Sequence, residues 1–177
     1  MTILSYNELC DLVDCGVVEN VEPWQIQGSS IDLTLGGRLM LEGGGNELVT
    51  KYNPLPLIEH EMTHTYTLDP NEFILAHTRQ IFNIPADMCA VYYMNSSMAR
   101  NGLQHMLATF CDPNWHGSAL TLELQNATKR HSIRLEKGMR IGQVVFHKLS
   151  SPVPHDMSYA VRGRYNNDLS VQGVKSK

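Results

Sequence analysis

Turn-forming residues divide this chain into short segments, and their spacing constrains the fold more than any other feature. Asp69-Pro70-Asn71, Pro85-Ala86-Asp87, Asp112-Pro113-Asn114 and Lys137-Gly138 interrupt the apolar runs. Proline and glycine at such positions end helices and central strands. The segments that remain between them have the length of strands and not of long helices.

The apolar segments between these turns are predicted strands. Residues 31–35 alternate apolar and polar side chains and stop at Gly36-Gly37, as a half-buried strand before a turn does. Further strands are predicted at 66–68, 73–77, 89–94, 119–125, 132–135 and 143–148. One helix is expected at residues 6–14, because Ser5 and Glu8 have capping-box spacing. This pattern predicts a mainly β sandwich or closed barrel.

Length and cysteine usage place the chain in a broad class. Residues 1–177 are expected to form one domain, which is long enough to bury a core without disulfides. No apolar run approaches the roughly 18 residues of a membrane-spanning helix, and no secretory signal is visible. Cys10, Cys15, Cys89 and Cys111 have no C-x-x-C spacing. We therefore expect a cytoplasmic protein with reduced thiols and no membrane partner.

Charge is distributed unevenly along the chain. Residues 1–128 contain four Lys/Arg against fifteen Asp/Glu, whereas residues 129–177 contain ten against three. The basic C-terminal third suits a compact anionic ligand, while the net charge of −4 disfavours extended nucleic acid. A solvated face is the alternative explanation. Residues from about 161 to 177 are rich in Gly, Asn, Ser, Arg and Lys, so this tail is expected to be mobile when free.

A zinc motif occurs in the sequence, in a context that disfavours zinc. His60-Glu61-Met62-Thr63-His64 matches H-E-x-x-H, which needs a helix to bring both imidazoles together. Pro54 and Pro56 lie just upstream, and on a strand the two histidines would lie roughly 13 Å apart. The H-x-E and P-C-x-x-C elements of zinc nucleotide deaminases are absent. Any hydrolytic deamination is therefore expected to proceed without zinc.

Two parts of residues 95–126 suggest chemistry. Ser96, Ser97 and Arg100 follow a predicted strand, and their hydroxyl and guanidinium groups suit a phosphate. A serine-capped turn with a surface arginine is the structural alternative. Further on, Glu123 shares a strand face with polar residues. It is either a solvated side chain or a general base in a polar cleft.

Several motifs resemble those of the dCTP deaminase family, whose members are relatives of the trimeric dUTPases. In chain order they are S-x-D-L-x-L-G from Ser30, S-S-M-A-R-x-G-L from Ser96, D-P-x-W-x-G from Asp112, L-T-L-E-L-x-N from Leu120 and L-x-x-G-M-R-I-G-Q-x-V-F from Leu135. The resemblance covers residues 28–173, most of the chain. It implies a distorted jelly-roll or β-barrel of the dUTPase type, with a short N-terminal helix and a mobile tail that acts as a lid.

The resemblance also implies roles for single residues. Glu123 matches the catalytic glutamate that activates water, and Ser96 and Arg100 match the residues that orient the water and this glutamate. The implied substrate-binding residues are Ser97 and Arg164 at the triphosphate, Asp112 at the deoxyribose, Ala108 and Thr109 at the pyrimidine, Gln172 in the tail, and Asn95. Asn95 stands where the family usually has an arginine, and Arg164 stands where it usually has a lysine.

The implied reaction is zinc-independent hydrolysis of dCTP to dUTP and ammonia. Mg²⁺ is expected to be held through the triphosphate, with no metal ligand from the protein, and active sites are expected between the subunits of a homotrimer. Two alternatives stay open. A bifunctional deaminase and dUTP diphosphatase, or a plain dUTPase, is compatible with Asp112. A non-catalytic nucleotide-binding regulatory protein is compatible with Asn95 and the altered tail.

Overall fold

The chain folds mainly into β-structure, as predicted, and its buried apolar side chains form one cluster. A computed structural model describes residues 2–45 and 47–175. The strands are Thr2–Ile3 (β1), Val18–Glu19 (β2), Ile31–Thr34 (β3), Arg38–Glu42 (β4), Leu57–Glu61 (β5), Thr65–Leu68 (β6), Phe73–Asn83 (β7), Met88–Met94 (β8), Leu103–His105 (β9), Phe110–Cys111 (β10), His116–Asn126 (β11), Ile133–Glu136 (β12) and Arg140–Lys148 (β13).

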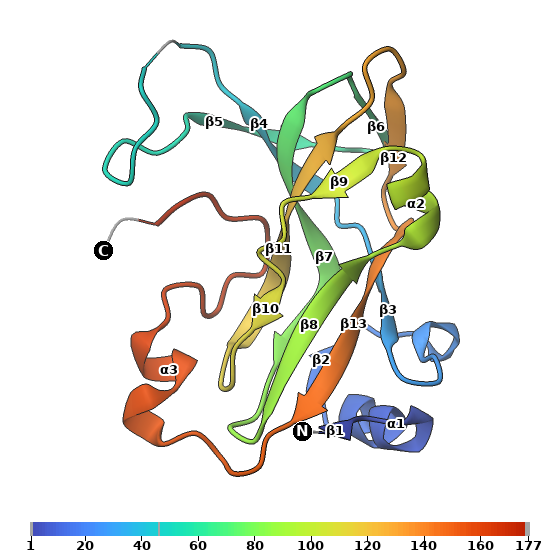
Figure 1. Ribbon diagram of the computed structural model, residues 1–177, viewed down its shortest axis with the longest axis vertical. Coiled ribbons are helices and arrows are strands. Elements are labelled where there is room, and N and C mark those ends of the chain that lie inside the picture. The colour runs from blue at the N-terminus through green and yellow to red at the C-terminus, as the bar shows by residue number, and fades with distance from the viewer. Residues whose placement is uncertain (1, 46, 176–177) are drawn as a thin grey trace.

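These strands form two larger sheets and one small one (Figure 1). The first sheet has the order β1-β13-β8-β10, and β3 also pairs with β13. The second has the order β5-β4-β7-β11-β9, and β2 also pairs with β7. The small sheet joins β12 to β6. All the neighbouring strands whose register is given are antiparallel, which fits the turn-punctuated sequence.

The helices are short. The predicted N-terminal helix is present as α1 (Tyr6–Asp14), where the backbone N–H of Ser5 donates to the Glu8 carboxylate at 2.9 Å. The others are α2 (Ser96–Arg100) and α3 (Tyr159–Arg162), with single 3₁₀ turns at Pro23–Gln25 and His155–Met157. No helix within the described residues is long and apolar enough to cross a membrane.

Every predicted strand falls on an observed one, but the sequence pattern did not reveal several of the strands with which they pair. The strands β1, β2 and β10 have two residues each, which is too short for a period of two to be visible. The hairpin β4–β5 was also missed. The prolines upstream had excluded a central strand, and β5 does begin just after Pro56, at the edge of its sheet. His60 and Glu61 therefore end a strand and not a helix.

The segment S-x-D-L-x-L-G has a structural role. Its aspartate, Asp32, is buried on β3, and the Arg140 guanidinium of β13 lies 2.9 Å from its carboxylate. The Gln25 amide donates to the Asp32 carbonyl at 2.6 Å. These contacts join the 3₁₀ turn, β3 and β13, so the motif fixes one end of the first sheet.

The glycine in the motif M-R-I-G-Q has a packing reason. Gly142 lies on β13 between β3 and β8, directly against the ring of buried Tyr92. A Cβ added at Gly142 would lie 2.2 Å from a ring carbon of Tyr92. The Tyr92 hydroxyl also donates to the Ile141 carbonyl at 3.2 Å, which holds the ring in place. Only glycine fits here without moving the tyrosine.

Replacing Gly142 with alanine should therefore destabilise the fold. Overpacking of a filled core typically costs about 1–3 kcal/mol, and the ring of Tyr92 has no room to retreat. The measurement is the urea midpoint followed by circular dichroism. Gly28→Ala is the matched control, because a Cβ there meets no heavy atom within 4 Å. Equal midpoints for the two variants would contradict the packing argument.

Candidate active site

A cavity of about 430 Å³ opens beside the middle of β11. Leucine, phenylalanine and tryptophan side chains form much of its wall, including Leu57 from β5 and Leu75 from β7. Three carboxylates, those of Asp112, Glu123 and Asp168, interrupt this apolar lining. A mostly apolar concave site with a few polar groups is the usual form of a small-molecule site.

Glu123 reaches this cavity because of the alternation along β11. Leu122 and Leu124 point into the core and are fully buried, so the residue between them points to the opposite face. The Glu123 side chain keeps 25% of its surface exposed. Burial raises the pKa of its carboxyl above the ordinary value for glutamate.

His105, which the sequence analysis did not single out, faces Glu123. It ends β9, opposite Leu124 of β11, and its Nε2 lies 3.2 Å from Glu123 Oε2. The backbone N–H of Leu107 donates to His105 Nδ1 at 3.1 Å, so the ring hydrogen is assigned to Nε2. Burial lowers the pKa of His105 to about 4. The imidazole is therefore neutral at neutral pH, and its hydrogen is on the ring nitrogen nearest the carboxylate.

The contact between these two groups leaves hydrogen-bonding capacity unused. His105 Nε2 and Glu123 Oε2 are close, but they are not aligned as a hydrogen bond. Together with Ser170 Oγ they are the buried side-chain polar atoms without a hydrogen-bond partner in the part of the chain that the structure describes. Buried polar groups are rarely left unpaired, and exceptions gather at functional sites.

Some of the other predicted residues meet at the same cavity. Asp112, Ala108 and Gln172 line it together with Glu123. Burial raises the pKa of Asp112 as well. Thr109 lies instead in a neighbouring cavity of about 180 Å³, which His105 also lines. Ala108 and Thr109, the two residues predicted to contact the pyrimidine, thus line two different cavities.

The predicted phosphate-binding residues lie elsewhere in the chain. Ser96, Ser97 and Arg100 are exposed on α2 and do not line the Glu123 cavity. In Figure 1, α2 lies on the other side of β11 from the C-terminal segment. The physical reason is that α2 follows β8, a strand of the other sheet. One chain alone therefore does not assemble Ser96 and Arg100 with Glu123.

Asn95 has a local role that the sequence analysis did not foresee. It is the N-cap of α2, and its Oδ1 accepts hydrogen bonds from the backbone N–H groups of Ser97 at 2.9 Å and Met98 at 3.3 Å. Asparagine is a preferred N-cap residue because its side chain satisfies these free donors. At the position where the resemblance implies an arginine, this chain therefore has a residue that caps a helix and carries no charge.

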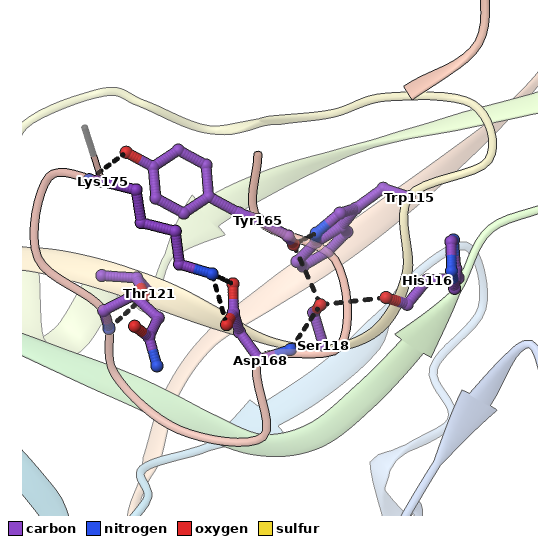
Figure 2. Close-up of polar contacts among 8 residues, drawn as sticks. Trp115, His116, Ser118, Thr121, Tyr165, Asp168 and Lys175 are labelled. Carbon is purple, nitrogen blue, oxygen red and sulfur yellow. Dashed lines mark hydrogen bonds and ion pairs between the residues drawn. The ribbon is translucent and has the colours of Figure 1, made fainter. Parts of the chain in front are cut away.

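The C-terminal segment makes polar contacts with the beginning of β11 (Figure 2), and several of its residues line the cavity. The Tyr165 carbonyl accepts from Trp115 Nε1 at 2.6 Å and from Ser118 Oγ at 3.0 Å. The backbone N–H of Ala119 donates to the Asp168 carbonyl at 2.8 Å. The predicted mobility of residues 161–177 stays a prediction, and the last two of them lie outside the described residues.

Of the two tail residues predicted to bind substrate, Gln172 lines the cavity and Arg164 does not. The backbone N–H of Gln172 donates to Thr121 Oγ1 at 3.2 Å, which places it at the cavity. Arg164 does not line the cavity; its guanidinium donates to the Lys175 carbonyl at 2.9 Å. Tyr159 of α3 also lines the cavity, whereas the nearby Met157 is exposed.

The described residues contain no cluster of three or more His, Cys, Asp or Glu side chains placed to hold a metal ion. His60 and His64 of the H-E-x-x-H match form no such cluster. The protein therefore offers no ready-made set of metal ligands in the part that the structure describes.

Comparison with known proteins assigns the family. Residues 3–149 match the protein family described as dCTP deaminase-like. The chain belongs to the dCTP deaminase family. It is 37% identical to "dCTP deaminase, dUMP-forming" of Dictyoglomus turgidum, over 85% of this chain and 80% of that protein. It is 34% identical to the protein of the same name from Aquifex aeolicus, over 92% of this chain and 90% of that protein.

A solved structure of a dCTP deaminase supports the fold. The 2′-deoxycytidine 5′-triphosphate deaminase of Agrobacterium tumefaciens aligns with a TM-score of 0.66 at 22% identity. The match covers 81% of this chain and 48% of that one, so this chain spans about half of its length. The family resemblance and the mainly β fold predicted from sequence are thereby confirmed. The chain is an enzyme of the dCTP deaminase family.

Replacing His105 with phenylalanine should raise the pKa of Glu123 further. The change removes the N–H that faces the carboxylate and adds an apolar ring, and both effects disfavour the charged form. A ¹³C NMR titration measures this pKa directly, with the Glu123 signal identified by its loss in Glu123→Gln. His147→Phe, on β13 and outside the cavity lining, is the control. An unchanged titration in His105→Phe would show that His105 does not influence the carboxylate.

Proposed function

We propose that this chain catalyses the hydrolytic deamination of dCTP, with Glu123 as the general base. The observation that carries the proposal is the half-buried Glu123 carboxylate in a cavity that Asp112 and Gln172 also line. Membership of the dCTP deaminase family supports the same substrate. Cytosine C4 is a poor electrophile, so the reaction needs an activated water and a stabilised tetrahedral intermediate.

Glu123 suits the proton transfers of this reaction. Ionised, it accepts a proton from the attacking water, and protonated, it delivers that proton to the departing amine. Its raised pKa makes both directions easier near neutral pH, because the ideal pKa of such a group lies near the working pH. The neutral His105 Nε2 lies 3.2 Å from Oε2 and adds no positive charge beside the carboxylate.

Ser96, Ser97 and Arg100 enter this proposal from a neighbouring subunit of a homotrimer. They are exposed on α2 and absent from the Glu123 cavity of their own chain. Large apolar side chains directly after β9 are also exposed, Met106 at 50% and Leu107 at 78%. A partner that buried them would stabilise the assembly, and its α2 would bring hydroxyl and guanidinium donors to the triphosphate.

The proposed reaction is independent of zinc, and Mg²⁺ belongs to it as part of the substrate, the Mg²⁺ complex of dCTP. The support is the residue set already described, which offers no cage of protein ligands within the described residues. Mg²⁺ commonly binds enzymes through substrate phosphates and retained waters.

A second step, hydrolysis of the product dUTP to dUMP and diphosphate, is a further candidate. Both relatives named above are called dUMP-forming, whereas the sequence analysis placed dUTP first as the product. Asp112 lines the same cavity as Glu123, so one bound nucleotide would lie near both carboxylates. A plain dUTPase would leave Glu123 without a function. A regulatory protein without activity fits poorly with the family membership.

Product analysis distinguishes these candidates. The protein is treated with a zinc chelator, resupplied with Mg²⁺, mixed with dCTP, and sampled over time by ion-exchange chromatography. We expect ammonia to be released at the rate of the untreated protein, with dUMP accumulating if the second step operates and dUTP accumulating otherwise. Formation of dCMP, or activity lost with zinc and restored only by zinc, would contradict the proposal.

Replacing Glu123 with glutamine should abolish deamination and leave the fold intact. An amide cannot accept the proton of water, and loss of general-base catalysis typically costs at least about 10²–10⁴ in rate. Ammonia release gives the rate, and thermal unfolding with and without dCTP shows that the variant folds and binds. Gln125→Leu changes the next residue on the same strand face and is the control. Turnover within about threefold of the wild type would remove Glu123 from the mechanism.

A further inference from the structure

An ion pair closes the C-terminal segment into a loop. Lys175 Nζ lies 2.6 Å from both carboxylate oxygens of Asp168 (Figure 2). The Asp168 side chain is 12% exposed and that of Lys175 is 34% exposed, so the pair is partly shielded from water. Such a pair is screened less by salt than a fully exposed one.

Further contacts join the two ends of this loop, residues 165–175. Lys175 Nζ lies 5.6 Å from the centre of the Tyr165 ring, and the backbone N–H of Lys175 donates to the Tyr165 hydroxyl at 3.4 Å. Arg164 donates to the Lys175 carbonyl. Without these contacts and the ion pair, the residues after Gln172 would be held at one end only. The ion pair is the contact among them that joins two charged side chains, and it helps to fix the far end of the segment.

The closed loop lies across the cavity. Its residues Tyr165, Asp168, Gln172, Gly173 and Val174 line the same hollow as Glu123. At Gly173 the backbone is so close to β5 that an added Cβ would lie 2.9 Å from Leu57 Cδ1. Backbone hydrogen bonds to β11 hold the first part of the loop. The Asp168–Lys175 pair then holds the last part of the loop against the first part.

The same pair changes the charge that a ligand meets. Asp112, Glu123 and Asp168 all line the cavity, although the proposed substrate, the Mg²⁺ complex of dCTP, is itself an anion. Lys175 contacts both oxygens of Asp168 and offsets its charge. Without Lys175, an uncompensated and largely buried carboxylate would face the incoming nucleotide and repel it.

We propose that Asp168 and Lys175 are a positioning pair that clasps the C-terminal segment over the cavity and masks the charge of Asp168, and that this pair thereby sets the affinity for the nucleotide. The clasping part depends on contacts within the protein alone. The affinity part rests on the proposed function. The two parts therefore have separate tests.

Trp115 reports on the clasp without any nucleotide. The chain has two tryptophans, and Trp24 is 56% exposed whereas Trp115 is 7% exposed and donates to the Tyr165 carbonyl. In a Trp24→Phe background, the fluorescence of Trp115 measures docking of the segment. Trypsin cleavage after Arg164 gives a second, independent measure.

The variants are Lys175→Met, Asp168→Asn and the double variant, with Lys175→Arg as the conservative replacement. Arg162→Met is the matched control, because it removes a tail cation whose side chain hydrogen-bonds to Met157 Sδ and forms no ion pair within the described residues. We expect all three clasp-breaking variants to shift Trp115 emission to longer wavelength and to be cut faster. We expect Lys175→Arg and Arg162→Met to resemble the wild type in emission. If Lys175→Met and Arg162→Met have the same emission and cleavage rate after Arg164, the clasp does not exist.

Steady-state deamination of dCTP tests the effect on affinity. Lys175→Met should raise KM about tenfold, with kcat changed less than about threefold, because the pair acts on binding and not on the reacting atoms. The double variant should have a lower KM than Lys175→Met, since the repelling carboxylate is also gone. Lys175→Arg should restore the wild-type KM.

The outcomes separate the two hypotheses. If the wild type releases no ammonia from dCTP, the proposed function fails, while emission and cleavage still decide whether the clasp exists. If the wild type deaminates dCTP and the clasp variants lose docking, an unchanged KM overturns the role in affinity. A double variant with the same KM as Lys175→Met overturns the charge-masking part.

Discussion

The antiparallel pairing of β7 with β11 is the constraint on which the site depends. Its register places Glu123 opposite Leu75 and Gln125 opposite Phe73. Leu122 and Leu124 are consequently in the core, and Glu123 lies on the cavity side. Because side chains alternate along a strand, a slip of one residue would bury the carboxylate and expose both leucines. The core thus selects the register, and the register places the candidate base.

The second edge of β11 determines what surrounds that base. Only residues 124–126 of β11 pair with β9, which brings His105 beside Glu123. The earlier part of this edge would present unpaired backbone groups, and the C-terminal segment satisfies them at Ala119 and His116. Gly117 permits this approach: its φ is +63°, and a Cβ there would lie 2.5 Å from Asn167 Oδ1. The D-P-x-W-x-G motif is therefore explained by docking of the chain's own tail.

Local patterns in the sequence predicted the elements that have local causes. The capping box gave α1, alternation gave the long strands, and strand alternation together with the family resemblance singled out Glu123. His105 was not predictable in this way, since β9 is three residues long and its partner lies about twenty positions further on. The Asp168–Lys175 contact joins two residues of a segment with no periodicity at all. The first contact depends on how two strands meet and the second on how the tail folds back on itself, and a local pattern contains neither kind of information.

The charges around the cavity show how a carboxylate-rich hollow is made compatible with an anionic substrate. Burial raises the pKa values of Glu123 and Asp112, which reduces the cost of keeping either one neutral. His105 is neutral at neutral pH because burial lowers its pKa to about 4, so it places no positive charge beside Glu123. Lys175 offsets the third carboxylate. In the proposed assembly, the remaining attraction for phosphates comes from the exposed α2 of a neighbouring subunit. Proton transfer and anion binding would then be served by separate groups, and the pKa of the base could be set by burial independently of the strength of phosphate binding.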